Sequence, residues 1–135
     1  MPKPPIETTL TWTHDLAFTA TSGPITLTLD GHTKAGASPV QALAMALAGC
    51  MAIDVVDIVV KGRHALTGLT ATLVAQRAEE PPHRFTHVTL HVLVTGAVPD
   101  GAVERAIQLS REKYCSVWHS LRQDIPFDVT FTIQP

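Results

Sequence analysis

Two cysteines are the residues of this 135-residue chain whose type and spacing are suited to redox chemistry. Cys50 lies in the apolar segment ALAGCMAIDVV, and Cys115 lies far downstream in EKYCSVWHSL. Two thiols that meet in a fold can form a reversible disulfide, whereas free cysteines are often small buried core residues. The residues alone leave both interpretations open, and the local sequence favours two structural thiols.

The immediate surroundings of Cys50 do not favour a reactive thiolate. Asp54 lies one helical turn beyond it and Asp57 two turns beyond, so the three residues share one helical face. A carboxylate close to a thiol disfavours the thiolate form. Cys50 is also mid-helix, away from the positive end of the helix dipole. An activating cation would have to come from another part of the fold.

Three histidines, His83, His87 and His91, have spacings that invite a comparison with metal sites. In a strand, His87 and His91 stand roughly 13 Å apart on one face. A single ion with ligand bonds near 2 Å cannot bind both side chains. We interpret them as solvent-facing residues of a half-exposed sheet and predict no metal site.

Composition limits the classes of partner. The net charge of −2 gives no basic excess for nucleic acid or an anionic membrane. The N-terminus lacks the apolar core of a signal peptide, and the apolar stretch from Val40 to Ile53 is shorter than the roughly 20 residues of a spanning helix. No dinucleotide, P-loop or H-E-x-x-H motif is present, so no cofactor is predicted. We expect a cytoplasmic protein whose cysteines are free or redox-active.

Sequence periodicity predicts an α+β fold with antiparallel sheets, in a single domain over residues 1–135. A second helical region is predicted from Asp100 to Arg111, resuming after Tyr114 and ending near Arg122. Alternation with a period of two predicts strands in residues 10–30, 66–79, 85–95 and 127–133.

A long helix is predicted from Pro39 to Lys61, with Ser38 as its N-cap and Gly62 as its C-terminal stop. Its first three turns are apolar on all sides, which predicts that the front half is buried in the centre of the structure. The back half is predicted to turn its charged residues, Asp54 among them, toward solvent.

Three segments together resemble the OsmC/Ohr family of osmotically inducible and organic-hydroperoxide-resistance proteins, most nearly its YhfA-like subgroup. They read SPVQALAMALAGCMAIDVV, RAEEPPHRFTHVTLHVLVTG and ERAIQLSREKYCSV. The resemblance covers nearly the whole chain. It implies antiparallel sheets wrapped around a long buried central helix in an intertwined homodimer.

The resemblance also implies a thiol peroxidase that reduces organic hydroperoxides, with Cys50 as the peroxidatic and Cys115 as the resolving residue. An external dithiol would then reduce the disulfide that they form. The resemblance further implies that a Glu and an Arg from the N-terminal region activate the reactive thiolate. In this chain Val40 stands at the position of that Glu, and no Arg precedes Arg63. A replacement cation is sought among five other residues: Arg77, Arg84, Arg105, Arg111 and Lys113.

Two other functions remain open on the sequence. One is a non-enzymatic protein of the same fold that binds a small ligand or senses oxidation, with little peroxidase activity. The other is a retained fold in which both thiols are purely structural.

Overall fold

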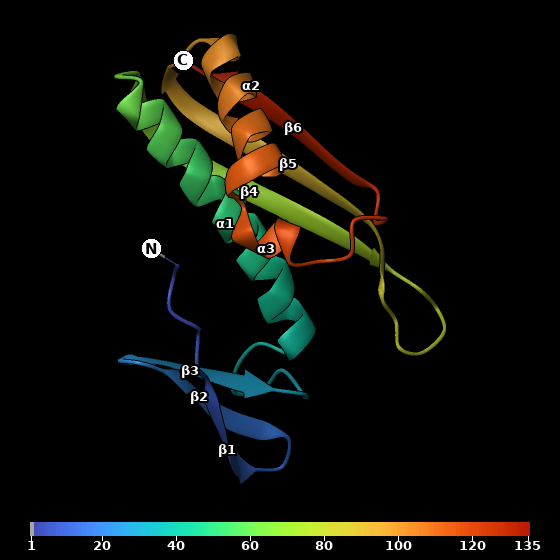
Figure 1. The fold of residues 1–135 in the computed structure, drawn as a ribbon. Helices are drawn as coiled ribbons and strands as arrows, with labels where there is room; N and C mark the ends of the chain where they lie inside the picture. Colours follow the sequence, from blue (N-terminus) through green and yellow to red (C-terminus); the bar gives the residue numbers. More distant parts are fainter. Residues whose placement is uncertain (1) are drawn as a thin grey trace. The chain divides into compact units, whose positions relative to one another are not determined.

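The computed structural model describes residues 2–135 and divides the chain into two compact units. The first unit ends at Leu43, and the second runs from Ala44 to Pro135. Each unit contains its own three-stranded sheet (Figure 1). The single domain predicted for residues 1–135 stays a prediction.

The sheet of the first unit is antiparallel, in the order β1–β2–β3. Its strands are β1 (Thr9–His14), β2 (Ala17–Ser22) and β3 (Ile25–Asp30), which confirms the short strands predicted in this region. Gly23, at φ +57°, takes the left-handed conformation that the tight turn between β2 and β3 requires.

Asp30 holds the loop that leads from β3 to the next element. Its carboxylate accepts hydrogen bonds from the backbone N–H groups of Ala35 (2.9 Å), His32 (2.8 Å) and Lys34 (3.2 Å). These donors, that of Ala35 foremost, stabilise the carboxylate and hold the pKa of Asp30 below its usual value.

The long helix α1 spans Pro39–Lys61, and its predicted N-cap is confirmed. The Ser38 hydroxyl accepts from the Gln41 N–H (3.1 Å), and the Gln41 side-chain oxygen accepts from the Ser38 N–H (3.0 Å). This reciprocal pair is a capping box. The helix ends before Gly62, as predicted, but the residue in the left-handed conformation is Arg63, at φ +63°.

Only one stripe of α1 is buried, and it consists of Leu47, Met51, Val55 and Val59. The prediction of a front half buried on all sides is wrong for the single chain, since Met45 is 63% exposed. An apolar helix surface is buried only where another element covers it, and the chain covers one face of this helix.

The membrane argument drawn from the sequence also needs correction. The sequence analysis measured only the apolar stretch from Val40 to Ile53, whereas the whole helix Pro39–Lys61 is, by length and composition, long enough to cross a membrane. It is the one such helix among residues 2–135. The core helix of a soluble protein can have the same length and composition.

The sheet of the second unit has the order β4–β5–β6, with strands β4 (Ala65–Arg77), β5 (Phe85–Ala97) and β6 (Phe127–Gln134). The predicted antiparallel hairpin of β4 and β5 is confirmed. The prediction of antiparallel pairing fails at β6, which runs parallel to β5. Parallel neighbours need a crossover connection, and a helical segment between β5 and β6 provides it.

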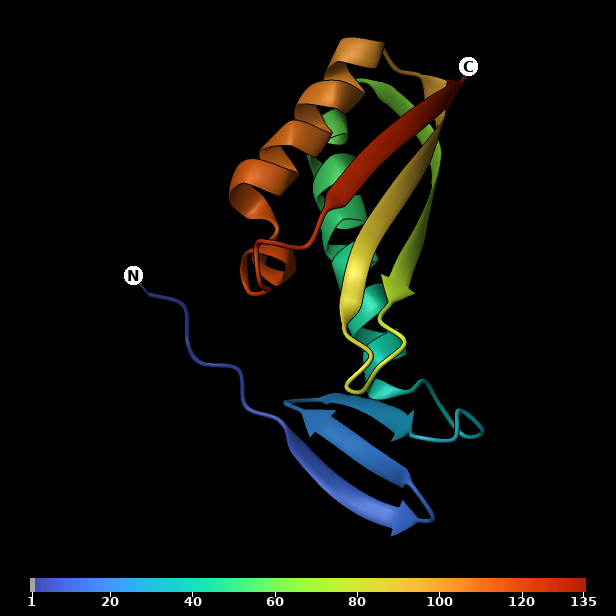
Figure 2. The ribbon, with the colours of Figure 1, turned by 90° about the vertical axis from the view of Figure 1, so that its right-hand side faces the viewer.

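The two faces of β5 differ as its alternation predicts. Val88, Leu90, Val92 and Val94 are buried, whereas Thr89 on the opposite face is exposed. Both α1 and the crossover helix α2 lie on the same side of this sheet (Figures 1 and 2). The core of the second unit therefore lies between one sheet face and these helices.

The crossover consists of three helical pieces: α2 (Asp100–Leu109), the π-helix η1 (Ser110–Tyr114) and α3 (Ser116–His119). The predicted helix from Asp100 is confirmed, except that Pro99 is the N-cap. Its α-helical geometry ends at Leu109 rather than Arg111, because the next turn widens into η1. No residue pattern predicted that change.

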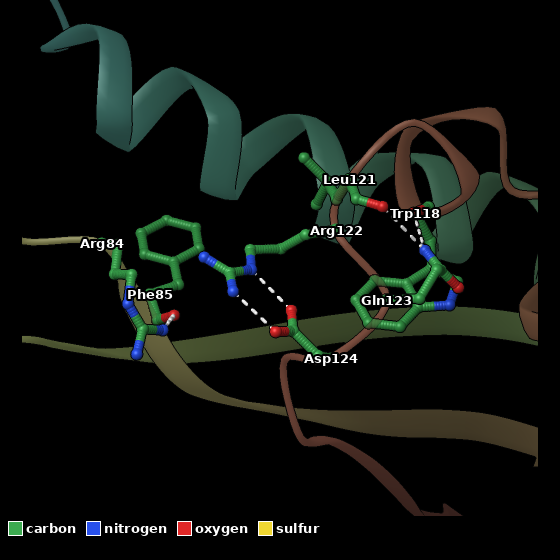
Figure 3. Close-up of polar contacts among 7 residues, drawn as sticks. All are labelled: Arg84, Phe85, Trp118, Leu121, Arg122, Gln123 and Asp124. Atoms are coloured by element: carbon green, nitrogen blue, oxygen red, sulfur yellow. Dashed lines mark hydrogen bonds and ion pairs between the residues drawn. The ribbon is translucent and has the colours of Figure 1, made fainter.

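The loop after α3 is fixed by its own polar side chains (Figure 3). The Gln123 amide donates to two backbone carbonyls, one of them that of Trp118 (2.9 Å), and the guanidinium of Arg122 forms a two-pronged ion pair with Asp124. The Trp118 ring lies 4.7 Å, centroid to centroid, from that of Phe127 at the start of β6. These contacts hold α3 against the sheet.

We expect Leu90→Ala to lower the free energy of unfolding by about 2–5 kcal/mol, because it leaves a cavity beneath the central strand. Urea denaturation measures the change. Thr89→Ala, on the exposed face of the same strand, is the control and is expected to have a much smaller effect. Equal losses for the two variants would contradict the assigned faces.

Candidate functional site

The two cysteines, far apart in the sequence, lie together in the second unit. Cys50 is in the middle of α1, and Cys115 is the residue between η1 and α3. Both are free thiols, and Cys50 lies close enough to Cys115 to raise its pKa. The structure thus brings together the two residues that the sequence selected.

Cys115 is fully buried, whereas Cys50 is partly exposed. As the N-cap of α3, the Cys115 sulfur accepts a hydrogen bond from the Trp118 N–H at 3.4 Å. The Cys115 N–H donates to the carbonyl of Ser110 at 2.8 Å, which closes the π-helical turn. Backbone contacts on both sides therefore fix the position of Cys115.

The surroundings of Cys115 favour the neutral thiol. Burial, as the largest cause, raises its pKa from 9.0 to about 11. The Trp118 N–H opposes this rise, while the neighbouring Cys50 and the charge of Asp54 add to it. Cys115 is therefore protonated at neutral pH.

The sequence analysis predicted that Asp54 turns toward solvent, but the residue is half-buried. Its carboxylate is partly buried and accepts a hydrogen bond from the Ser110 hydroxyl, with 2.7 Å between Ser110 Oγ and Asp54 Oδ2. Ser110 is fully buried. The sequence analysis gave Ser110 no role. The one sequence feature that could have indicated a role is that this serine continues the apolar stripe of α2.

Four of the five cations proposed as activators contact other groups. Arg77 Nε donates to the His83 carbonyl and Arg84 Nη1 to that of Phe85 (Figure 3), and Arg105 is exposed. Arg111 lies 5.2 Å from the centroid of the Phe127 ring, and Lys113 lies 5.3 Å from that of Tyr114. The groups that set the pKa of Cys115 within residues 2–135 include none of these cations.

The histidines of β5 lie on the outer face of the sheet, as predicted. His87 Nε2 is 2.7 Å from Asp128 Oδ2, and His91 Nδ1 is 2.7 Å from Thr130 Oγ1. Among residues 2–135, no group of three or more His, Cys, Asp or Glu side chains is arranged to hold a metal ion. These contacts join β5 to β6 across the surface.

An apolar groove of about 680 Å³ lies between α1 and β4. Its lining begins at Ala52 and does not include Cys50, so the groove is not a pocket around that thiol. The groove is lined by Ala52, Ile53, Val56, Asp57, Val60, Leu66, Thr67, Gly68 and Leu69.

The raised pKa of Cys115 predicts a pH-dependent contribution to stability. A thiol whose pKa is higher in the folded state stabilises the fold fully below its unfolded pKa, near 9, and loses this effect as the pH rises toward 11. We expect the difference in free energy of unfolding between the reduced wild type and Cys115→Ala to shrink between pH 9 and 11. Denaturation curves measured in a reductant across this range test it.

Alkaline titrations of groups that do not interact with Cys115 affect both proteins alike, so they cancel in this difference. A difference that stays constant from pH 7 to 11 would contradict the buried, protonated thiol.

Comparisons with known proteins match most of this chain. The family model described as OsmC-like protein matches residues 31–130. Protein YhfA of Escherichia coli (strain K12) is 44% identical over 109 residues, which cover 78% of this chain and 81% of that protein.

Solved structures share the fold. A hypothetical protein from Aquifex aeolicus VF5 superposes with a TM-score of 0.90 at 23% identity, over 98% of each chain. An organic hydroperoxide resistance protein OsmC from Legionella pneumophila gives a TM-score of 0.71 at 16% identity, over 98% of this chain and 99% of that one. The extent of the family match and the identity to Protein YhfA show that this chain belongs to the OsmC/Ohr family.

Proposed function

We propose that this protein reduces organic hydroperoxides through a disulfide cycle between Cys50 and Cys115. One observation carries the proposal: two free thiols from distant segments are neighbours, close enough for Cys50 to raise the pKa of Cys115, and one is partly exposed while the other is buried. Two unrelated core cysteines have no need to meet, whereas a disulfide cycle requires it. Some family members are named for organic hydroperoxide resistance, which supports the same chemistry.

The difference in exposure assigns the two roles. A peroxide can reach the partly exposed Cys50 from solvent, whereas Cys115 is fully covered. The attacking sulfur has to be a thiolate, and the raised pKa of Cys115 makes that residue the poorer nucleophile at neutral pH. Cys50 is therefore the peroxidatic residue and Cys115 the resolving one.

The cycle has three balanced steps. The Cys50 thiolate takes the distal oxygen of the hydroperoxide, the O–O bond breaks, and the alkoxide leaves as an alcohol after taking up a proton. The Cys115 thiol then condenses with the Cys50 sulfenic acid, forming the S–S bond and releasing water. An external dithiol reduces the disulfide by exchange and is itself oxidised to a disulfide. No bound cofactor takes part.

A second function is favoured by one specific observation: within residues 2–135, no cation is among the groups that shift the pKa of Cys115. Val40 stands where the family has its activating Glu, and Arg63 is the first arginine of the chain. A thiol pair without a stabilising cation reacts slowly, as suits a redox sensor or ligand-binding protein with little turnover. Turnover rates distinguish the two functions.

We also propose that the protein acts in the cytoplasm as the homodimer that its family implies, without nucleic acid or membrane as a partner. The exposed side of α1 supports the dimer, because Met45, Ile53 and Val60 are each more than half exposed. The groove beside α1 and β4 is also apolar and open. A second copy would cover such surfaces.

With cumene hydroperoxide, the reduced wild type is expected to lose two thiols per chain and to regain them with a dithiol. Cys50→Ser should abolish turnover, and Cys115→Ser should leave a sulfenic acid on Cys50 that dimedone labels. Thiol titration and mass spectrometry of the labelled peptides measure these outcomes.

Turnover in Cys50→Ser at the wild-type rate would refute the assigned roles. Stoichiometric oxidation without turnover would instead support the sensor function. Thiols that react only after denaturation would support two structural cysteines.

Sedimentation at micromolar concentration is expected to give a mass twice that of the chain. Ile53→Asp places a charge on the exposed apolar side of α1 and is expected to shift the mass toward the monomer. Thr89→Asp adds the same charge to the polar face of the second sheet and is expected to stay dimeric. A monomeric wild type would rule out the dimer.

A further inference from the structure

We propose that Asp54 and Ser110 are positioning residues for the disulfide step. Their hydrogen bond fixes the π-helical turn before Cys115 against the turn of α1 that follows Cys50. The redox step itself rests on the proposed function, but the positioning contact is a property of the fold.

On the side of α1, Asp54 is placed by its spacing from Cys50. The two residues are one helical turn apart and therefore on the same face. Asp57, on the next turn, is exposed and forms an ion pair with Lys61 at 2.9 Å. Asp54 thus differs from its neighbour in having a buried partner from another element.

On the side of η1, Ser110 makes two contacts that link Asp54 to Cys115. Its hydroxyl donates to Asp54 Oδ2 at 2.7 Å, and its carbonyl accepts from the Cys115 N–H at 2.8 Å. Ser110 is fully buried, so this hydroxyl has no competing bulk water. An interaction that holds Ser110 therefore also holds the residue that closes the π turn.

The π turn changes the direction in which Cys115 lies. The hydrogen bond from the Cys115 N–H to the Ser110 carbonyl joins residues five apart, one more than in an α-helix. Because each residue of an α-helix turns the chain by about 100°, one extra residue changes the direction of those that follow. Cys115 then leaves the helical conformation, at φ −73° and ψ 96°, and caps α3. A straight continuation of α2 would direct this thiol differently, so an anchor at the start of the turn matters for its meeting with Cys50.

The Asp54 charge has a second effect that opposes the first. The titratable groups facing Cys115 are Cys50 and Asp54, and both raise its pKa. Charged neighbours in sequence face elsewhere, with Arg111 over the Phe127 ring and Lys113 over Tyr114, Glu112 accepting from Gln108, and His119 facing the Arg111 carbonyl. The hydrogen bond therefore speeds the disulfide step by position, while the charge slows it by keeping Cys115 protonated.

Two variants separate the bond from the charge. Ser110→Ala removes the donor but keeps the carboxylate, whereas Asp54→Asn keeps an acceptor oxygen for Ser110 and removes the charge. Asp57→Asn is the matched control, since it removes an exposed carboxylate from the same helix. Each reduced variant is oxidised once with cumene hydroperoxide, and disulfide formation is followed by rapid acid quench across a pH series.

We expect Ser110→Ala to slow disulfide formation by about tenfold or more at every pH, since small misplacements of reacting groups carry large rate penalties. The midpoint of its pH profile should stay at the wild-type value. Asp54→Asn should move this midpoint to lower pH, and Asp57→Asn should match the wild type in both respects. A merely structural role for Asp54 would leave the midpoint unchanged.

Asp54→Ala tests the same hydrogen bond if Ser110→Ala does not fold, because it removes the acceptor from a partly exposed helical position. It should combine the slow rate with the lowered midpoint. Wild-type rates in both Ser110→Ala and Asp54→Ala, with an unshifted midpoint in Asp54→Asn, would overturn the inference.

The same series with diamide, which oxidises thiols without a peroxide, separates this inference from the proposed function. The expected order of the variants with diamide, without disulfide formation from hydroperoxide, would support the positioning contact and refute the peroxidase. Hydroperoxide turnover without any difference among the variants would support the peroxidase and refute the positioning contact.

Discussion

The burial of the Cys115 thiol against Cys50 is the constraint on which this account depends. Removing a thiol from water disfavours its charged form, so the buried partner is kept neutral. A neutral, buried thiol beside a partly exposed one gives an asymmetric pair, in which Cys50 is accessible to solvent and Cys115 is not. Such asymmetry separates attack on an oxidant from resolution of the product.

The fold produces this pair through its crossover connection. Because β6 runs parallel to β5, the chain has to return along the helical side of the sheet, and this return brings α2, η1 and α3 to the side where α1 lies. The π turn interrupts the return at Ser110, and Cys115 then caps α3. The position of the second thiol is thus a consequence of sheet topology together with one irregular turn.

Local patterns were sufficient for most of the elements. Alternation predicted the strands, including the buried row from Val88 to Val94, and the Ser-Pro opening predicted the start of α1. These features depend on neighbours in sequence, which residue types report directly. The two motifs around Cys50 and Cys115 also identified the family, which a single motif would not have done.

What the sequence could not predict depends on tertiary contacts. The parallel direction of β6 has no local signature, because the same alternation suits either direction. The partly buried position of Asp54 follows from Ser110, which lies in a different element, and Met45 is exposed because the chain covers only one side of α1. Apolar character predicts a need for burial, but it does not say which surface provides it.

The reduction potential of the Cys50–Cys115 couple tests the central claim most directly. Equilibration of the protein with a graded dithiol redox buffer, followed by mass spectrometry, counts the thiols at each potential. The account predicts one two-electron transition that links these two residues, at a potential above the roughly −300 mV below which structural disulfides lie. Two thiols that stay reduced at every potential, or that oxidise independently, would contradict it.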